Sequence, residues 1–335
     1  MTLYRFISNN ILFKFDPEFI HDCMQVILSN KFAPYLTSLY STSNKHISKT
    51  YIMGKELNSP LALAAGFDKN CAILKALDKL GFGYIVGGTV TINPRPGNLK
   101  PRITRYTHND SMVNSLGFPN LGVDKIIENL SKYDLKTPLI MSISGDSISD
   151  ITELYKLLSD YCFGFEINIS SPNTEGLKIF HEKSTLSKLL TRINDMRTKP
   201  LVIKMPHLIN STKNNTLKIP ELLEMVSIIT ENNIDGITIA NSMPIIDSRL
   251  STGNGGMSGK PLFNNMIKII QEIDKEFKGK IKIHACGGIF SGEDAWSAIE
   301  AGAETIQIYS SFIYRGPTIA SLINSELLKL KKNSS

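Results

Sequence analysis

Cysteine is scarce and scattered in this chain. The 335 residues include only 4 cysteines, at positions 23, 71, 162 and 286. No two of them form a C-x-x-C pair, so the sequence indicates neither a disulfide framework nor a zinc or iron–sulfur site. The 6 histidines also lack the spacing of metal ligands. We therefore expect no bound metal and a reducing compartment.

Long apolar runs are absent as well. No stretch approaches the roughly 20 residues that span a bilayer. Asn9, Asn10 and Lys14 interrupt the apolar stretch near the N-terminus, which therefore lacks the pattern of a signal peptide. We expect a location in the cytoplasm or on the cytoplasmic face of a membrane. The net charge of +6 is too modest and too dispersed to predict nucleic-acid binding, but it suits an anionic surface or substrate.

Residues 1–42 have a helical pattern that differs from the rest of the chain. Asp16 and Pro17 have the residue types of an N-cap and a first helical position. Apolar residues share one face before and after this cap; they are Leu3, Phe6, Ile7, Ile11, Ile20, Cys23, Met24 and Ile27. Two interpretations remain open: a helical pair packed on the main domain, or a hairpin whose apolar side contacts a membrane or admits a lipid-like ligand.

From residue 61 onward, strand-like runs alternate with helical periodicity. The predicted strands are 61–65, 84–89, 139–143, 164–169, 201–204, 236–240, 282–285 and 305–309. The predicted helices are 72–80, 123–130, 151–158, 186–196, 219–231, 262–277, 292–301 and 318–330. Eight strand–helix repeats predict an α/β fold, a (β/α)8 TIM barrel over residues 43–335. An open doubly wound sheet is the alternative, but no G-x-G-x-x-G opens a helix after the first strand.

Two connections, 90–119 and 243–261, are too long for tight loops. Both follow the carboxyl end of a predicted strand, which is the barrel face that carries chemistry. Long loops in that position are usually lids or binding loops. Lysines, amides and hydroxyls also follow most of the other strands, so we expect one polar mouth. Gly287-Gly288 and Tyr309-Ser310 follow the last two strands, where backbone amides could hold phosphate, although ordinary turn glycines would look the same.

Six segments together resemble the dihydroorotate dehydrogenases. They are residues 64–69 (AAGFDK), 87–97 (GGTVTINPRPG), 114–118 (NSLGF), 168–177 (NISSPNTEGL), 255–261 (GGMSGKP) and 307–310 (QIYS). The resemblance runs in consistent order from about residue 50 to residue 320. It implies an FMN-dependent enzyme of pyrimidine biosynthesis that oxidises (S)-dihydroorotate to orotate.

Within this family the catalytic base distinguishes two classes. The soluble class uses cysteine and the membrane-associated class uses serine; the residue here is Ser171. The N-terminal helices agree with the second class, which carries such an extension to admit quinone, and residues 15–21 (FDPEFIH) resemble the start of its second helix. The resemblance thus implies a peripheral protein on the cytoplasmic side of the cell membrane, with a membrane quinone as electron acceptor, and a monomer.

The resemblance also implies a role for each site residue. Ser171 is the expected base and Thr174 the proton relay. Expected substrate contacts are Lys69, Asn114, Ser115, Leu116, Gly117, Phe118, Asn168, Asn173, Asn241 and Ser242. Expected FMN contacts are Ala65, Gly66, Lys69, Thr89, Ser142, Asn168, Lys204, Ala240, Gly259, Gly288, Tyr309 and Ser310.

Three positions depart from the family pattern. Ser142 replaces the usual asparagine, Ala240 replaces a more usual threonine, and Pro206-His207 stands where relatives carry an alanine–proline–aspartate run. The base, both lysines and the amides remain. Rival functions are a soluble-class enzyme that reduces fumarate or NAD, an FMN enzyme for another pyrimidine, a non-redox barrel that binds a phosphorylated ligand, and a barrel kept only as a scaffold.

Overall fold

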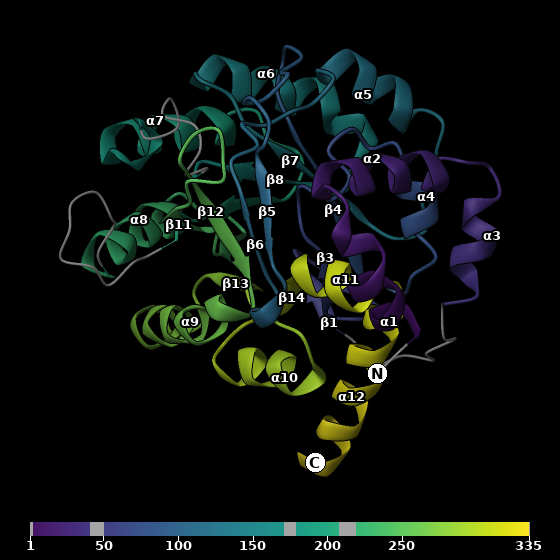
Figure 1. Cartoon of the computed structure of the whole chain (residues 1–335). Coiled ribbons are helices and arrows are strands. Elements are labelled where there is room, and N and C mark those ends of the chain that lie inside the picture. The colour runs from purple at the N-terminus through teal and green to yellow at the C-terminus, as the bar shows by residue number, and fades with distance from the viewer. Residues whose placement is uncertain (1–2, 41–49, 171–178, 208–218, 335) are drawn as a thin grey trace.

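Eight parallel strands close into a barrel at the centre of the molecule, which is a computed structural model (Figure 1). It describes residues 3–40, 50–170, 179–207 and 219–334. The barrel strands are β3 (Leu61–Leu63), β4 (Tyr84–Val90), β7 (Leu139–Ile143), β8 (Gly164–Asn168), β9 (Leu201–Lys204), β10 (Gly236–Ile239), β13 (Lys282–Cys286) and β14 (Thr305–Ile308). Each lies within or close to a predicted strand, so the prediction of a TIM barrel is confirmed.

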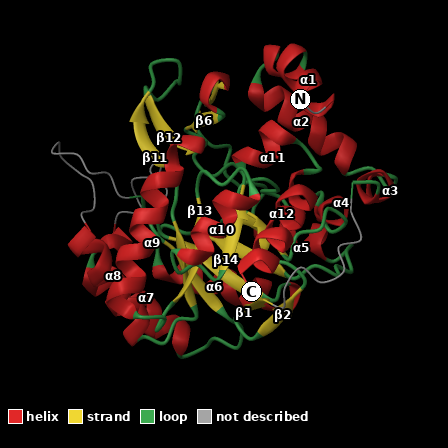
Figure 2. Ribbon diagram, turned by 90° about the horizontal axis from the view of Figure 1, so that it is seen from below, coloured by secondary structure: helices red, strands yellow, loops and turns green. Residues whose placement is uncertain are grey.

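Helices surround the barrel, as the view from below shows (Figure 2). They are α4 (Leu74–Leu77), α5 (Val123–Leu130), α6 (Ile148–Leu158), α7 (Lys183–Asn194), α8 (Ile219–Glu231), α9 (Phe263–Phe277), α10 (Gly292–Glu300) and α12 (Ile319–Ser334). Ser147 and Ser291 begin α6 and α10 with capping boxes, in which serine and aspartate satisfy each other's backbone N–H groups. The sequence therefore fixes where these helices start.

One predicted helix is much shorter than expected. The sequence predicts a helix over 72–80, but α4 holds only Leu74–Leu77. The Asp68 carboxylate accepts hydrogen bonds from the backbone N–H groups of Ala72 and Ile73, at 2.9 and 2.8 Å. These hydrogen bonds hold residues 68–73 in a turn, so the helix begins only at Leu74. A further short helix, α11 (Ser310–Arg315), follows β14 directly.

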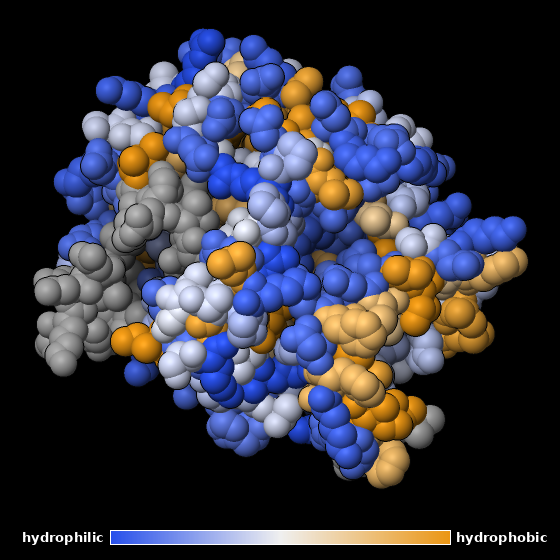
Figure 3. Space-filling model, turned by 45° about the horizontal axis from the view of Figure 1, so that its top comes forward, coloured by the Kyte–Doolittle hydropathy of each residue, from blue (hydrophilic) through white to orange (hydrophobic). Residues whose placement is uncertain are grey.

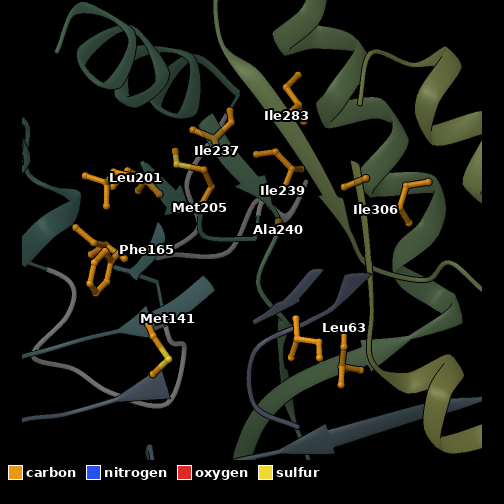
Figure 4. Close-up of a cluster of buried hydrophobic side chains, with 14 of the residues drawn as sticks. Leu63, Met141, Phe165, Leu201, Met205, Ile237, Ile239, Ala240, Ile283 and Ile306 are labelled. Carbon is orange, nitrogen blue, oxygen red and sulfur yellow. The ribbon is translucent and has the colours of Figure 1, made fainter. Parts of the chain in front are cut away.

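The hydrophobic core has two layers, one on each side of the barrel wall. The outer layer lies between strands and helices and includes Phe165 and Ile237, shown in Figure 4. The inner layer fills the lower part of the barrel and includes Tyr84, Val86 and Ile140. A hairpin of β1 (Thr50–Ile52) and β2 (Lys55–Leu57) closes that end with Ile52 and Leu57. The barrel is thus a filled core, open only at its other end.

The two long connections pair with each other in a second sheet. Residues of the first form β5 (Ile103–Tyr106) and β6 (Ser111–Asn114), and residues of the second form β11 (Met243–Ile246) and β12 (Asn254–Gly259). The four strands are antiparallel in the order β11-β12-β6-β5. The pairing places Asn114 and Gly259 beside the barrel mouth, where both line its cavity.

Three helices precede the barrel. They are α1 (Leu3–Asn10), α2 (Pro17–Leu28) and α3 (Ala33–Ser38), with a 3-10 turn, η1 (Leu12–Lys14), between the first two. The predicted cap is confirmed, because the Asp16 carboxylate accepts from the N–H groups of Glu18 and Phe19. The Tyr4 hydroxyl anchors α1 by donating to the carbonyl of Ile313 on α11, at 2.8 Å.

Much of the apolar surface of these helices faces outward. Large side chains at least half exposed are Phe6, Ile11, Phe15, Phe19, Val26, Ile27, Phe32, Tyr35, Leu36 and Leu39. Figure 3 shows hydrophobic residues gathered on the side that α1 to α3 occupy in Figure 1. None of the helices in the described residues is both long and apolar enough to cross a bilayer.

Candidate active site

The barrel mouth opens into a cavity of about 1100 Å3, counted to its open rim. Most of the sequence-predicted site residues line it. They are Ala65, Gly66, Lys69, Thr89, Asn114, Leu116, Gly117, Phe118, Asn168, Lys204, Ala240, Asn241, Ser242, Gly259, Gly288, Tyr309 and Ser310. These residues come from seven barrel strands or the segments after them and from the second sheet, so the fold brings distant parts of the chain to one place. Predicted residues Ser171, Asn173 and Thr174 lie outside the described residues.

Two predicted residues lie behind the cavity wall. Ser142 on β7 is fully buried, and its hydroxyl forms a hydrogen bond of 2.9 Å with the hydroxyl of Thr89. Ser115 is also fully buried, and its backbone N–H donates to the carbonyl of Arg102. Thr89 itself lines the cavity. The Ser142 hydroxyl therefore orients Thr89 in the cavity wall. This contact is what serine provides at a position where the family pattern has asparagine.

Amide side chains form a connected group on one side of the mouth. Asn168, at the end of β8, donates to the Thr89 hydroxyl at 3.3 Å. Asn241, after β10, donates to the Asn168 carbonyl oxygen at 3.3 Å and to the Ser170 hydroxyl at 3.1 Å. Ser170 in turn donates to the backbone carbonyl of Lys204. This network fixes donors and acceptors together, as recognition of a ring that carries both requires.

Glycines at the mouth let two segments of the chain's own backbone pack closely around it. Gly288 has φ +75°, and a Cβ there would lie 2.5 Å from the backbone nitrogen of Phe263. Gly259 has φ +107°, and its Cβ would lie 2.4 Å from the carbonyl oxygen of Asp110. Any side chain would therefore be both strained and blocked. Ser310 stands nearby, with its hydroxyl donating to that of Ser258 at 3.0 Å.

Lys69 is the first of two lysines at the mouth. It follows β3 and lines the cavity. Burial lowers its pKa to about 8, although the carboxylates of Glu18, Asp68 and Asp22 act in the opposite direction. A lysine with this pKa is mostly protonated at neutral pH and suits an anionic ligand.

Lys204 is the second lysine, at the end of β9, and it is buried. Its ammonium lies 3.7 Å from Oε1 of Glu166, a carboxylate on β8 that is also buried. Burial alone would lower the pKa of Lys204, but the facing carboxylate outweighs it and the pKa is raised. The lysine at the cavity floor is therefore charged.

A polar layer separates the cavity from the apolar lower barrel. Thr238 on β10 donates to Oε2 of Glu166 at 2.7 Å, and Gln307 on β14 donates to the same oxygen at 3.3 Å. Gln307 also reaches the hydroxyl of Tyr84, which shares a 2.8 Å hydrogen bond with Thr305. These bonds cross the barrel interior, since β8, β10 and β14 are not adjacent in the sheet.

A second cavity lies between α2 and the barrel mouth. Its lining includes Glu18, His21 and Gln25 of α2, and it shares three residues with the first cavity. Arg102 fixes α2 here through Glu18, with Nε 3.0 Å from Oε1. The two cavities are therefore neighbours, separated by three residues that line both of them: Lys69, Leu116 and Pro119.

The segment after Lys204 departs from the family pattern but is well packed. His207 is buried, and its Nε2 lies 3.0 Å from the amide nitrogen of Asn265 on α9. Burial lowers the pKa of His207 to about 4, so the ring is neutral and accepts this hydrogen bond. His207 thus joins the segment to the outer helices instead of lining the cavity.

The geometry of the mouth agrees with the comparison to known proteins. Residues 47–330 match the family model described as dihydroorotate dehydrogenase. The chain belongs to the dihydroorotate dehydrogenase family. A relative named dihydroorotate dehydrogenase (quinone), from Christiangramia forsetii, is 33% identical and aligns over 98% of this chain and 99% of its own. Another relative of the same name, from Idiomarina loihiensis, is 34% identical and aligns over 95% of this chain and 98% of its own.

A solved structure supports the same assignment. DHODH from Eimeria tenella in complex with ferulenol superposes with a TM-score of 0.81 at 27% identity, over 95% of this chain and 92% of the other. The relatives' shared name confirms the predicted quinone-dependent class and an oxidoreductase. Sequence reasoning missed Glu166, Thr238, Arg102 and Glu18. A charged residue inside the short strand 164–168 was the available signal for Glu166.

Proposed function

We propose that this chain oxidises (S)-dihydroorotate to orotate in pyrimidine biosynthesis, with FMN as cofactor and a membrane quinone as final acceptor. The observation that carries the proposal is the single cavity in which two lysines, a connected amide group and two obligatory glycines meet. The name shared by the two relatives supports the substrate and the acceptor.

The residues present fit FMN. The mouth cavity offers a charged lysine, hydrogen-bonding side chains and glycine backbone to one ligand. Gly259, Gly288 and Ser310 would hold the ribityl phosphate end, because glycine backbone can approach phosphate oxygens closely. Thr89, Asn168 and Lys204 would hold the ring. When bound, FMN supplies the chemistry that the side chains lack, since its N5 accepts the hydride from C6 of the substrate.

The chain's own residues bind the substrate and manage the proton. Lys69 offers a positive charge to the substrate carboxylate, while Asn114, Asn168 and Asn241 offer donors and acceptors to the ring. Ser171 is the proposed base for the C5 proton, and Thr174 and the backbone near Phe118 are its proposed relay. A hydroxyl is a poor base, so water must be excluded while the proton moves. The roles of Ser171, Asn173 and Thr174 rest on the sequence resemblance.

The N-terminal helices are the proposed route to quinone and membrane. The cavity under α2 adjoins the barrel mouth at Lys69, so an acceptor there would approach the cofactor. The exposed apolar side chains of α2 and α3 suit contact with lipid. We place the protein peripherally on the cytoplasmic side of the cell membrane, as a monomer, with residues 1–42 as the extension that faces the membrane.

The test is electron transfer from dihydroorotate by the purified protein, with quinone, fumarate or NAD offered in parallel. We expect orotate with quinone alone and yellow, FMN-containing protein. Ser171→Ala should lower turnover by about 10²–10⁴-fold, as removal of a general base does. Ser149→Ala, on the exposed surface of α6, is the matched control and should leave turnover unchanged. Reduction of fumarate or NAD would overturn the quinone assignment, and a colourless protein would overturn FMN.

A further inference from the structure

Glu166 is a carboxylate in the middle of a barrel strand. It is 1% exposed and points into the barrel interior, where the side chains of β10 and β14 reach it. Burying an ionised carboxylate costs several kcal/mol unless charge and hydrogen bonds compensate it. An apolar side chain at this position would fill the same space without that cost. We therefore expect the contacts of this carboxylate to indicate its function.

Its two oxygens have different surroundings. Oε2 accepts from the Thr238 hydroxyl at 2.7 Å and the Gln307 amide at 3.3 Å. Oε1 has no hydrogen-bond partner among the described residues and lies 3.7 Å from the Lys204 ammonium. One oxygen is therefore anchored by side chains of β10 and β14, which leaves the other to face the lysine that lines the cavity.

The remaining titratable groups around the pair carry no charge. Burial raises the pKa of the Cys286 thiol on β13 and of the Tyr84 hydroxyl on β4, so both stay protonated at neutral pH. Burial also lowers the pKa of His284 on β13 to about 4, which leaves its ring neutral. In the part of the chain that the structure describes, Glu166 is thus the negative charge that faces Lys204 in this layer.

We propose that Glu166 is a positioning residue, which keeps the Lys204 ammonium charged and fixed in the cavity wall, where it would contact the flavin ring. The inference rests on the proposed function for its consequence, since a charge held there stabilises the negatively charged reduced form of the cofactor. Without the carboxylate, an ammonium buried at this depth loses its proton more easily. Glu166 touches neither substrate nor cofactor and acts through the lysine.

The test is the midpoint potential of bound FMN as a function of pH in wild type and Glu166→Gln. In the variant, reduction of the cofactor draws a proton onto Lys204, so the potential should fall more steeply with pH. One extra proton per two electrons is a tenfold change in the equilibrium per pH unit, which is about 30 mV. A role in packing alone would shift the curve without changing its slope, and an unchanged slope overturns the proposal.

Three variants serve as controls. Glu166→Asp keeps the charge and should retain the wild-type slope. At the opposite end of the barrel, the Glu304 carboxylate lies 3.5 Å from the Lys282 ammonium. Glu304→Gln removes this carboxylate and should leave the midpoint potential and its pH dependence unchanged. In a Lys204→Met background, Glu166→Gln should add no slope. An added slope in that background would assign the ionisation to another group and contradict the inference.

A measurement on the protein without cofactor separates this inference from the proposed function. In Glu166→Gln the folded state binds the Lys204 proton less readily than the unfolded chain, so stability relative to wild type should rise with pH up to the unfolded lysine pKa of about 10.4. A constant difference in melting temperature from pH 6 to pH 10 would overturn the Lys204–Glu166 coupling. Wild-type protein that binds no FMN would instead overturn the proposed function and leave this result standing.

Discussion

At the scale of single residues, Lys69 links charge to catalysis. Its pKa of about 8 means that the positive charge proposed to bind the substrate carboxylate disappears as pH rises above that value. We expect kcat/KM for dihydroorotate to fall about tenfold per pH unit above pH 8, because this ratio reports ionisations of the free enzyme. Lys69→Arg keeps its charge over the whole range, so its profile should stay flat there. A fall that persists in Lys69→Arg would assign the ionisation to another group.

Gly288 tests the close approach of backbone to the cofactor. Gly288→Ala should strip FMN from the protein, because the new Cβ would lie 2.5 Å from the backbone nitrogen of Phe263 and displace the segment proposed to hold phosphate. Gly253→Ala is the matched control: its φ of +69° is similar, but nothing lies within 4 Å of the added carbon. Both variants incur the cost of positive φ, about 1 kcal/mol, whereas only Gly288→Ala should lose cofactor. The flavin content after gel filtration measures the difference.

At the scale of elements, one ion pair holds α2 against the barrel mouth. The Glu18 and Arg102 side chains are only 12% and 10% exposed, and the guanidinium also donates to the carbonyls of Pro96 and Asn98. Its charge lowers the pKa of Glu18 even though burial acts to raise it. Glu18→Gln should therefore loosen α2, raise the KM for quinone and speed limited proteolysis within residues 15–40.

The control for that prediction is Glu128, a helix carboxylate that also has two cationic partners but lies on the surface. Glu128 on α5 pairs with Lys125 and Lys132, but all three side chains are about half exposed. Exposed pairs of this kind contribute little to stability. Glu128→Gln should leave both the quinone KM and the proteolysis pattern as in wild type. An equal effect of the two substitutions on the quinone KM and on proteolysis would show that other contacts of α2 hold it, such as the hydrogen bonds of His21 and Gln25 to the carbonyl of Phe67.

The alternation of elements could be read from the sequence because each one follows a local rule. Short β-rich runs, capped helices and the cap at Asp16 gave all eight barrel strands and the approximate positions of the helices around them. The second sheet could not be read in the same way. Its strands β6 and β12 pair although Asn114 and its partner Gly256 lie 142 positions apart in the chain. In addition, four glycines in β12 and the turn before it weaken the strand pattern. Such pairing depends on the barrel being formed.

Site prediction has a similar boundary. Residues at the strand ends could be named because the resemblance and the barrel geometry both point to that face, and most of them line one cavity. Groups that act through another residue carry no motif. Glu166 and Thr238 lie in strands, and only the closed barrel shows that a threonine on β10 reaches a glutamate on β8.

At the scale of the whole molecule, the mouth cavity, the second cavity and the N-terminal helices follow one another in space from the barrel to the outer surface. The mouth cavity meets the second cavity at Lys69, and α2 covers the second cavity. The outer surfaces of α2 and α3 then carry side chains such as Ile27, 53% exposed, and Leu39, 79% exposed. This order places the polar reaction inside and the apolar surface at the periphery, as a protein that delivers electrons to a lipid-soluble acceptor requires.

That arrangement predicts where the protein meets a membrane. We expect the holoenzyme to bind phospholipid vesicles, with its net charge of +6 favouring anionic lipid. Replacing Ile27, Leu36 and Leu39 with serine should weaken binding by at least tenfold, because burial of one such side chain contributes about 1.5–3 kcal/mol and each 1.4 kcal/mol is tenfold. Turnover with a short, water-soluble quinone should be preserved, since these side chains lie on the outer surface and the cavities are untouched.

The comparison that decides this prediction uses apolar residues exposed elsewhere. Leu99 and Ile246 are 81% and 87% exposed and belong to the two long connections after β4 and β10, not to the N-terminal helices. Their replacement with serine removes a comparable apolar area, so it controls for general hydrophobicity. If vesicle flotation falls equally in both sets, attraction is nonspecific and the N-terminal helices are no membrane face. A loss confined to the Ile27, Leu36 and Leu39 variant assigns the contact to α2 and α3, next to the cavity proposed for quinone.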